Sequence, residues 1–262
     1  MINITAKEVQ NLRAMTGAPM MDCKLALIAA KGDLEIAKDW LRKKGLAQVD
    51  KKANRDANEG LIGVFVSDNS VGIVEINCET DFVARNEKFQ DFVREVTQKI
   101  VDGDSFAVDT TEIVSVLGEN IKLGNYRILD AYAHESISTY IHGSVGEGVG
   151  KIGVAVLHTG DDDLGKKIAM HIAAMKPTAV SIEQLDPEWV AKEKRLLTEQ
   201  AIESGKPENI VEKMVVGRMN KVLRGVTLVN QPFVMDMGKT VGDLLEENDA
   251  RVVDFIRLEV GA

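Results

Sequence analysis

The chain has 262 residues, of which 45% are hydrophobic and 28% are charged, a composition typical of a soluble protein with more than one domain. No apolar run approaches the roughly 20 residues of a membrane-spanning helix. The start, Met1-Ile2-Asn3-Ile4-Thr5, lacks the regions of a signal peptide, so we expect a cytoplasmic protein. The net charge of −9 repels phosphate backbones and disfavours bulk binding of nucleic acid.

The first 45 residues predict three short helices. Thr5 and Glu8 form a capping box before the first helix, which ends at Thr16-Gly17. The second covers about Pro19 to Ala30, and Asp33 caps the third. The inward face of the third helix is expected to carry Ile36, Ala37, Trp40 and Leu41.

A linker and a β-hairpin are predicted next. Leu46 to Gly60 is rich in Ala, Lys and Asp and predicts the linker. The basic residues from Arg42 to Arg55 are interrupted by acids, which favours a solvated helix end over an RNA contact. Strands Leu61–Val66 and Val71–Asn77 then turn at residues 68–70, and a helix from Glu87 to about Val101 covers them.

Between the hairpin and that helix lies the short turn Thr80-Asp81-Phe82-Val83, followed by Asn86, a good helix N-cap. Turns of this kind lie on the surface and carry binding residues. Two interpretations are open for Phe82. It is in phase with Phe89 on one helical face and could belong to the core, or it could be an exposed aromatic anchor for a pocket on another protein, with Asp81 setting the register.

An internal repeat bears on this choice. Val71-Gly72-Ile73-Val74 corresponds to Ile152-Gly153-Val154-Ala155, 81 residues later, and a helix from about Asp163 to Met175 follows the second copy. The repeat predicts two similar strand–helix halves in one core. The second copy has Asp163 where the first has Phe82, so the aromatic is not a packing requirement of the unit. This favours a specific role for Phe82.

The rest of the chain predicts a helical hairpin and a return to the sheet. Asp186-Pro187 opens a helix to about Ser204, and after Gly205-Lys206-Pro207 a second helix runs to about Arg224. Each arm is roughly 27 Å long. The facing residues are expected to be Val190, Leu197 and Ala201 in the first arm and Val211, Met214, Arg218 and Val222 in the second. Gln231–Met235, a helix capped by Thr240 and the strand Val252–Val260 follow.

The sequence shows no active site. Gly143–Lys151 is rich in glycine, but Ile152 follows the lysine where a phosphate loop needs Ser or Thr, and the next element is a strand, so we expect no nucleotide binding. The histidines His134, His142, His158 and His171 are scattered, and we interpret His171 as a hydrogen-bonded core residue. Cys23 and Cys78 lack metal-ligand spacing and are expected to be reduced structural thiols. We expect a protein without metal or cofactor that is not an enzyme.

Four blocks of sequence stand out along the chain. They are Leu12-Arg13 through Thr16-Gly17-Ala18 to Met20-Met21-Asp22-Cys23-Lys24, then Thr80-Asp81-Phe82-Val83, then His171-Ile172-Ala173-Ala174-Met175-Lys176-Pro177, and finally Ser204-Gly205-Lys206-Pro207, Glu212-Lys213-Met214, Gly217-Arg218-Met219 and Gln231-Pro232-Phe233-Val234-Met235. These blocks resemble the bacterial elongation factor Ts family, in the family's order and over essentially the whole chain.

The resemblance implies an α+β multidomain fold, with an N-terminal three-helix ubiquitin-associated-like bundle and a two-halved α+β core into which an antiparallel helical hairpin is inserted. We expect five segments: the bundle with its linker, the first core subdomain, the first part of the second subdomain, the hairpin, and the rest of the second subdomain. Their boundaries are 1–54, 55–140, 141–179, 180–228 and 229–262.

The resemblance also implies a function, that of a guanine-nucleotide exchange factor for elongation factor Tu. Asp81 and Phe82, held by Thr80 and Val83, would enter the partner's GTPase domain, displace its magnesium site and loosen GDP. Further contacts are expected from Met20, Met21, His142, Val234 and Met235. A homodimer or a heterotetramer with elongation factor Tu is compatible with the helical hairpin. Familiar members continue into a C-terminal helix that touches the partner, and this sequence ends at Gly261-Ala262, so that contact is not expected here.

Two other classes of function remain open. A binding adaptor or chaperone-like module could use the N-terminal bundle, and activity in residues 1–54 alone would support it. An enzyme could use Asp81 or His171, and turnover without a protein partner would support that interpretation.

Overall fold

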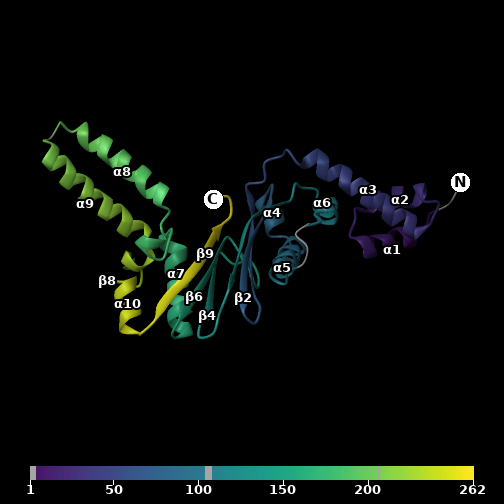
Figure 1. Cartoon of the computed structure of the whole chain (residues 1–262). Coiled ribbons are helices and arrows are strands. Elements are labelled where there is room, and N and C mark those ends of the chain that lie inside the picture. Colours follow the sequence, from purple (N-terminus) through teal and green to yellow (C-terminus); the bar gives the residue numbers. More distant parts are fainter. Residues whose placement is uncertain (1–3, 104–107, 206) are drawn as a thin grey trace.

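A helical bundle, a two-sheet core and a long helical hairpin follow one another across the molecule in the computed structural model (Figure 1). The structure describes residues 4–103, 108–205 and 207–262, so the predicted features at residues 1–3 and at Lys206 lie outside the described residues. The predicted α+β multidomain fold is confirmed. Within the described ranges no helix has the length and apolarity to cross a membrane.

The N-terminal bundle consists of α1 (Ala6–Thr16), α2 (Met20–Ala29) and α3 (Leu34–Lys52). The capping box of Thr5 and Glu8 is present, and Gly17, with a φ of 65°, ends α1 in the left-handed conformation. The bundle has its own small core, formed by Val9, Leu12, Ala18, Cys23, Ala26, Leu27, Ala30, Ala37 and Leu41. The predicted inward position of Ile36 is wrong, because its side chain is 57% exposed. The buried face of α3 follows Ala37, Leu41 and Gly45 at four-residue steps, and Ile36 lies about 100° away from it.

The linker expected from Leu46 begins later than predicted, because α3 continues to Lys52. Gly45 does not end the helix. It lets α3 approach α6 (Thr111–Leu117) closely, since a Cβ atom at Gly45 would lie only 2.7 Å from Cγ2 of Thr111. The residues that follow are mostly good helix formers, and the packing against α6 supports them.

Two antiparallel sheets form the core. The first has the strand order β3-β2-β1-β5 and the second has the order β4-β6-β9. Their bounds are β1 (Glu59–Val66), β2 (Ser70–Cys78), β3 (Lys122–Asp130), β5 (Val149–Gly150), β4 (Ser136–His142), β6 (Ile152–Thr159) and β9 (Arg251–Glu259). The boundary expected after residue 140 falls inside β4, which pairs with β6 along its whole length and so belongs to the second half.

The two sheets pack face to face and each is covered on its outer face by a helix, which gives four layers (Figure 1). α5 (Glu87–Val101) covers the first sheet and α7 (Asp162–Met175) covers the second. The inner layer joins Ile62, Val71, Ile73 and Leu129 of the first sheet to Ala155, Leu157 and Ile256 of the second. Because β2 is covered on both faces, most of its residues are buried, which explains its continuous apolar run.

The internal repeat corresponds to the two strand–helix pairs. Asp81 and Asp162 stand at the starts of the helices that follow β2 and β6. The halves differ at this point, because the first half has an additional single-turn helix, α4 (Asp81–Ala84), before α5. The second half enters α7 directly. Phe82 therefore lies in an element that the second half lacks.

The predicted helical hairpin is confirmed as α8 (Pro187–Ile202) and α9 (Glu208–Val226), which project from the core on the side opposite the bundle (Figure 1). The inward position predicted for Arg218 is wrong, because this side chain is exposed. The buried residues of α9 are Val211, Val215 and Met219. Helical periodicity is compatible with both the predicted and the observed set of buried residues in α9, and packing against α8 determines which set is buried.

The remaining short elements belong to the second half of the core, where Leu228, Phe233, Val241 and Leu245 share a buried cluster with residues of α7. They are η1 (Ile182–Gln184), η2 (Leu228–Asn230), β7 (Pro232–Phe233), β8 (Asp236–Thr240) and α10 (Val241–Glu247). Thr240 caps α10 as predicted, and β9 returns to pair with β6.

Candidate functional site

Local hydrogen bonds shape the turn that carries Phe82. Thr80 has an extended backbone, and its side-chain oxygen caps α4 by accepting from the N–H of Val83 at 3.4 Å. Asn86 caps α5 in the same way by accepting from the N–H of Lys88 at 3.0 Å. Two helices therefore begin within seven residues, directly after the end of β2.

The side chains of this turn divide between the core and the solvent. Val83 and Ala84 are buried in the cluster beneath α5. The side chain of Phe82 is 82% exposed, so the interpretation of Phe82 as a core residue is wrong. Phe89 fills the core position instead and is fully buried. Asp81 forms an ion pair with Arg85 at 3.3 Å, and both side chains are accessible to solvent.

A cleft lies beside this turn, and the glycine-rich loop after β4 forms part of its wall. Asp81 and Arg85 face the cleft together with Glu59, Leu61, Ala84, Gln90, Gly143, Val145 and Lys151. Lys151 forms an ion pair with Glu59 at 2.7 Å, and its ammonium also donates to the carbonyl of Gly60 at 3.2 Å. The loop leads into β6 and not into a helix, and both of these contacts of Lys151 are to residues of β1.

Cys78, which lies beneath the turn, is part of the packing. Its thiol donates to the carbonyl of Thr80 at 3.2 Å. Burial raises the pKa of Cys78 to about 12, so the group stays a neutral thiol and a poor nucleophile. Cys23 is also buried and free, as expected for a structural thiol. Among the described residues, no group of three or more His, Cys, Asp or Glu is placed to hold a metal ion.

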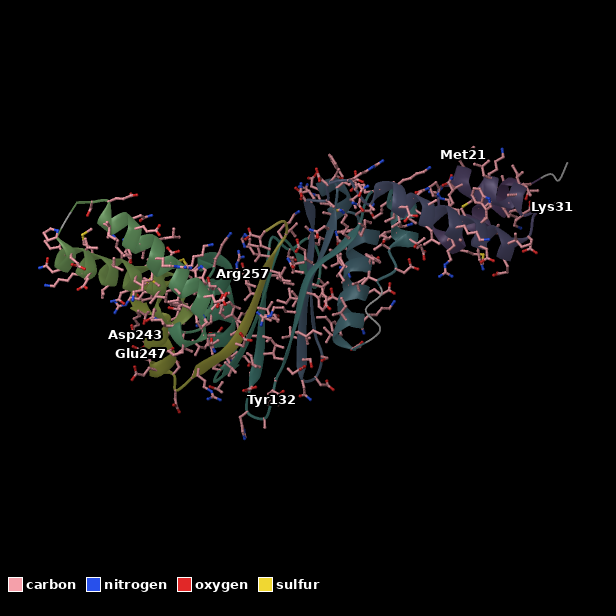
Figure 2. All side chains as sticks on the ribbon, turned by 45° about the horizontal axis from the view of Figure 1, so that its top comes forward. Met21, Lys31, Tyr132, Asp243, Glu247 and Arg257 are labelled. Atoms are coloured by element: carbon pink, nitrogen blue, oxygen red, sulfur yellow. The ribbon has the colours of Figure 1, made fainter. Side chains whose placement is uncertain are left out.

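The other predicted contact residues lie on three separate parts of the molecule. Met20 and Met21 are exposed at the start of α2, and Figure 2 shows Met21 on the bundle. His142 is exposed at the end of β4. Val234 and Met235 are exposed in the turn between β7 and β8, near the base of the helical hairpin (Figure 1). A small ligand could not touch all of these residues, so the arrangement favours a large partner.

Comparison with known proteins identifies the family. Residues 79–262 match the family model described as elongation factor TS, and residues 4–41 match that of the UBA/TS-N domain. The chain belongs to the elongation factor Ts family. The elongation factor Ts of Dinoroseobacter shibae is 44% identical over 272 residues, covering 98% of this chain and 92% of the relative. That of Brucella anthropi is 42% identical, covering 99% and 93%, and that of Francisella tularensis subsp. novicida is 44% identical, covering 100% and 93%.

The matched regions cover the predicted contact residues. The elongation factor Ts model begins at Glu79 and includes the Phe82 turn, His142 and the turn at Val234. The UBA/TS-N match includes Met20 and Met21. The sequence analysis missed two neighbours of Met21 on α2, Leu25 and Ile28, which are also exposed. Their spacing of four and three residues could have revealed one apolar stripe on the surface of the bundle.

His171, within another block that resembles the family, is the hydrogen-bonded core histidine that we predicted. Its Nε2 donates to Oε1 of Gln231 at 3.0 Å, and its Nδ1 accepts from the N–H of Val234 at 3.2 Å. Burial lowers the pKa of His171, which keeps the ring neutral and leaves Nδ1 free to accept. His171 therefore holds the start of the turn that exposes Val234 and Met235.

The sequence analysis also missed Glu119, which contacts the Phe82 turn. Its carboxylate accepts three hydrogen bonds from Glu79 and Thr80. The only local signal is Gly118, which marks a helix end. A partner 39 residues away along the chain cannot be read from that signal.

Proposed function

We propose that this chain is a guanine-nucleotide exchange factor that acts on elongation factor Tu. Membership of the elongation factor Ts family supports the partner. The exposure of Phe82 on a short turn beside the accessible carboxylate of Asp81 is the observation that carries the proposal, because an exposed aromatic side chain can fill a pocket on a partner and a neighbouring charge can set its register. The exchange factor itself makes and breaks no covalent bond.

In the proposed mechanism, Phe82 enters an apolar pocket of the GTPase domain and Asp81 approaches the magnesium site. Mg²⁺ requires near-ideal octahedral geometry at about 2.1 Å, so a small displacement of its oxygen ligands weakens its binding. Loss of the ion leaves the charge of the GDP phosphates uncompensated, and GDP dissociates. Met20 and Met21 of the bundle, His142, and the turn at Val234 and Met235 hold the partner from their three separate positions.

Thermodynamic linkage makes the effect reciprocal. The factor lowers the affinity of the partner for GDP by the same ratio by which GDP lowers the affinity of the partner for the factor. GTP then binds to the empty site and releases the factor, which can act again. The factor is therefore expected to work at concentrations far below that of its partner.

Release of a fluorescent GDP analogue from elongation factor Tu tests the proposal. We expect faster release when the full chain is added at substoichiometric concentration, with excess unlabelled nucleotide present. Stable binding to elongation factor Tu without faster release would refute the exchange function and favour an adaptor. Light scattering on the mixture would show whether a homodimer or a heterotetramer forms.

A further inference from the structure

The carboxylate of Glu119 holds the backbone that leads into the Phe82 turn. One oxygen, Oε2, accepts from the N–H groups of Glu79 and Thr80, each at 3.0 Å. The other, Oε1, accepts from the hydroxyl of Thr80 at 2.6 Å. Both oxygens of one side chain are thus used on two consecutive residues directly before Asp81.

The contact is reciprocal. Oε1 of Glu79 accepts from the N–H of Asn120 at 2.7 Å and forms an ion pair with Arg55 at 3.3 Å. The buried side chain of Asn120 donates to the carbonyl of Arg55 at 2.7 Å. Hydrogen bonds therefore run in both directions between residues 79–80 and residues 119–120. Asn120 also bonds to the segment that follows α3.

The fold places Glu119 there through the end of α6. Gly118, with a φ of 78°, caps this helix in the left-handed conformation, and its N–H donates to the carbonyl of Val114. The chain then runs past the end of β2 before β3 begins at Lys122. Glu119 lies in the short segment between α6 and β3.

The turn needs such a support because it is weak by itself. α4 has only four residues, and a single helical turn is unstable in water. Phe82 is largely exposed, so packing does not fix its direction in the free protein. A side chain that is fixed before binding loses less conformational entropy on binding than a mobile one.

We propose that Glu119 is a positioning residue for nucleotide exchange, which fixes the direction of Phe82 before the partner binds. This inference rests on the proposed exchange function. It predicts that Glu119 acts through Phe82 and Asp81 only, and that the positions of its oxygens matter more than its charge.

Exchange rates of four single variants test the proposal, measured at saturating factor with elongation factor Tu and a fluorescent GDP analogue. Glu119→Ala should lower the exchange rate about tenfold, because a misplacement near 1 Å is costly at a site of this kind. Glu119→Gln keeps the reach of the side chain and an acceptor for the two N–H groups, and should stay within about threefold of wild type. Glu119→Asp keeps the charge but shortens the side chain, and its exchange rate should fall toward that of the alanine variant. Glu112→Ala, at an exposed carboxylate on α6, is the matched control and should exchange normally.

A double-mutant cycle separates positioning from general destabilisation. In a background of Asp81→Ala and Phe82→Ala, the change Glu119→Ala should have no further effect on exchange. An equal tenfold loss in that background would show a merely structural role and overturn the proposal, and so would a better rate for Glu119→Asp than for Glu119→Gln. Circular dichroism would show whether Glu119→Ala folds. If it does not, the exchange rates of the Gln and Asp variants still test whether the positions of the oxygens matter more than the charge. No faster GDP release with the wild-type chain would refute the proposed function itself, and a normal rate for Phe82→Ala would refute the anchoring role of Phe82. A loss in Phe82→Ala with a normal rate in Glu119→Ala would refute only this inference.

Discussion

Phe82→Ala should abolish most of the exchange activity and leave the fold intact. A Phe side chain has about 200 Å² of surface. Because Phe82 is 82% exposed in the free protein, about 160 Å² remains for a partner to cover. At about 25 cal/mol per Å² this area is worth about 4 kcal/mol, and about 3 kcal/mol once the methyl group that alanine retains is subtracted. If the transition state for GDP release contains this contact, the exchange rate should fall about 100-fold.

The stability of the free protein should change little, by about 0.5 kcal/mol or less, because the deleted atoms lie in water. Stopped-flow release of a fluorescent GDP analogue measures the rate, and thermal unfolding measures the stability. Tyr132→Ala is the matched control, since Tyr132 is 75% exposed in the turn between β3 and β4 (Figure 2). An unfolded Phe82→Ala variant, an unchanged rate, or an equal loss in Tyr132→Ala would refute the reasoning.

Three further predictions concern the scaffold. Burial lowers the pKa of His171, so the neutral ring contributes to stability above the unfolded pKa of about 6.5, and this contribution is lost progressively as the pH falls below that value. The difference in Tm between wild type and His171→Asn should therefore shrink between about pH 7 and pH 5. A constant difference would contradict this. Cys23 and Cys78 are fully buried, so a thiol reagent should modify neither in the native protein and both in denaturant, and rapid labelling of native protein would argue against this packing. Gly217→Ala should stabilise by about 1 kcal/mol through helix propensity, whereas Gly45→Ala should destabilise by about 1–3 kcal/mol, since its Cβ would press on Thr111 at 2.7 Å and nothing lies within 4 Å at Gly217. Equal shifts in Tm for the two glycine variants would contradict the close approach of α3 to α6.

Local signals in the sequence predicted most of the helices and strands. Thr5, Asp33 and Thr240 cap their helices as expected, and the hairpin of β1 and β2 turns where its polar residues predicted. These signals are reliable because each acts within a few residues of chain. The same local reasoning failed at Ile36 and Arg218, where a helical stripe can be drawn in more than one way and only the neighbouring helix decides which residues are buried.

Phe82 shows where local reasoning stops. The helical spacing between Phe82 and Phe89 is compatible with a core position for Phe82. The second copy of the repeat has Asp163 at the corresponding position, which favoured a specific role for Phe82. Its exposure was settled by α4, an additional single turn that separates Phe82 from the helix on which Phe89 lies.

Local patterns in the sequence were enough to predict the bundle, the hairpin of β1 and β2, α5, α7 and the helical hairpin at their places in the chain, and the motif that carries Phe82. Caps, turns and hydrophobic periodicity specify these features over short distances. Only the tertiary packing shows that Phe82 is exposed to solvent and brings Glu119 into contact with Glu79 and Thr80. The N–H of Thr80 donates a hydrogen bond to Glu119, 39 residues away along the chain. A contact of that range depends on how α6 packs relative to the first sheet, and no pattern within a short stretch of residues predicts it.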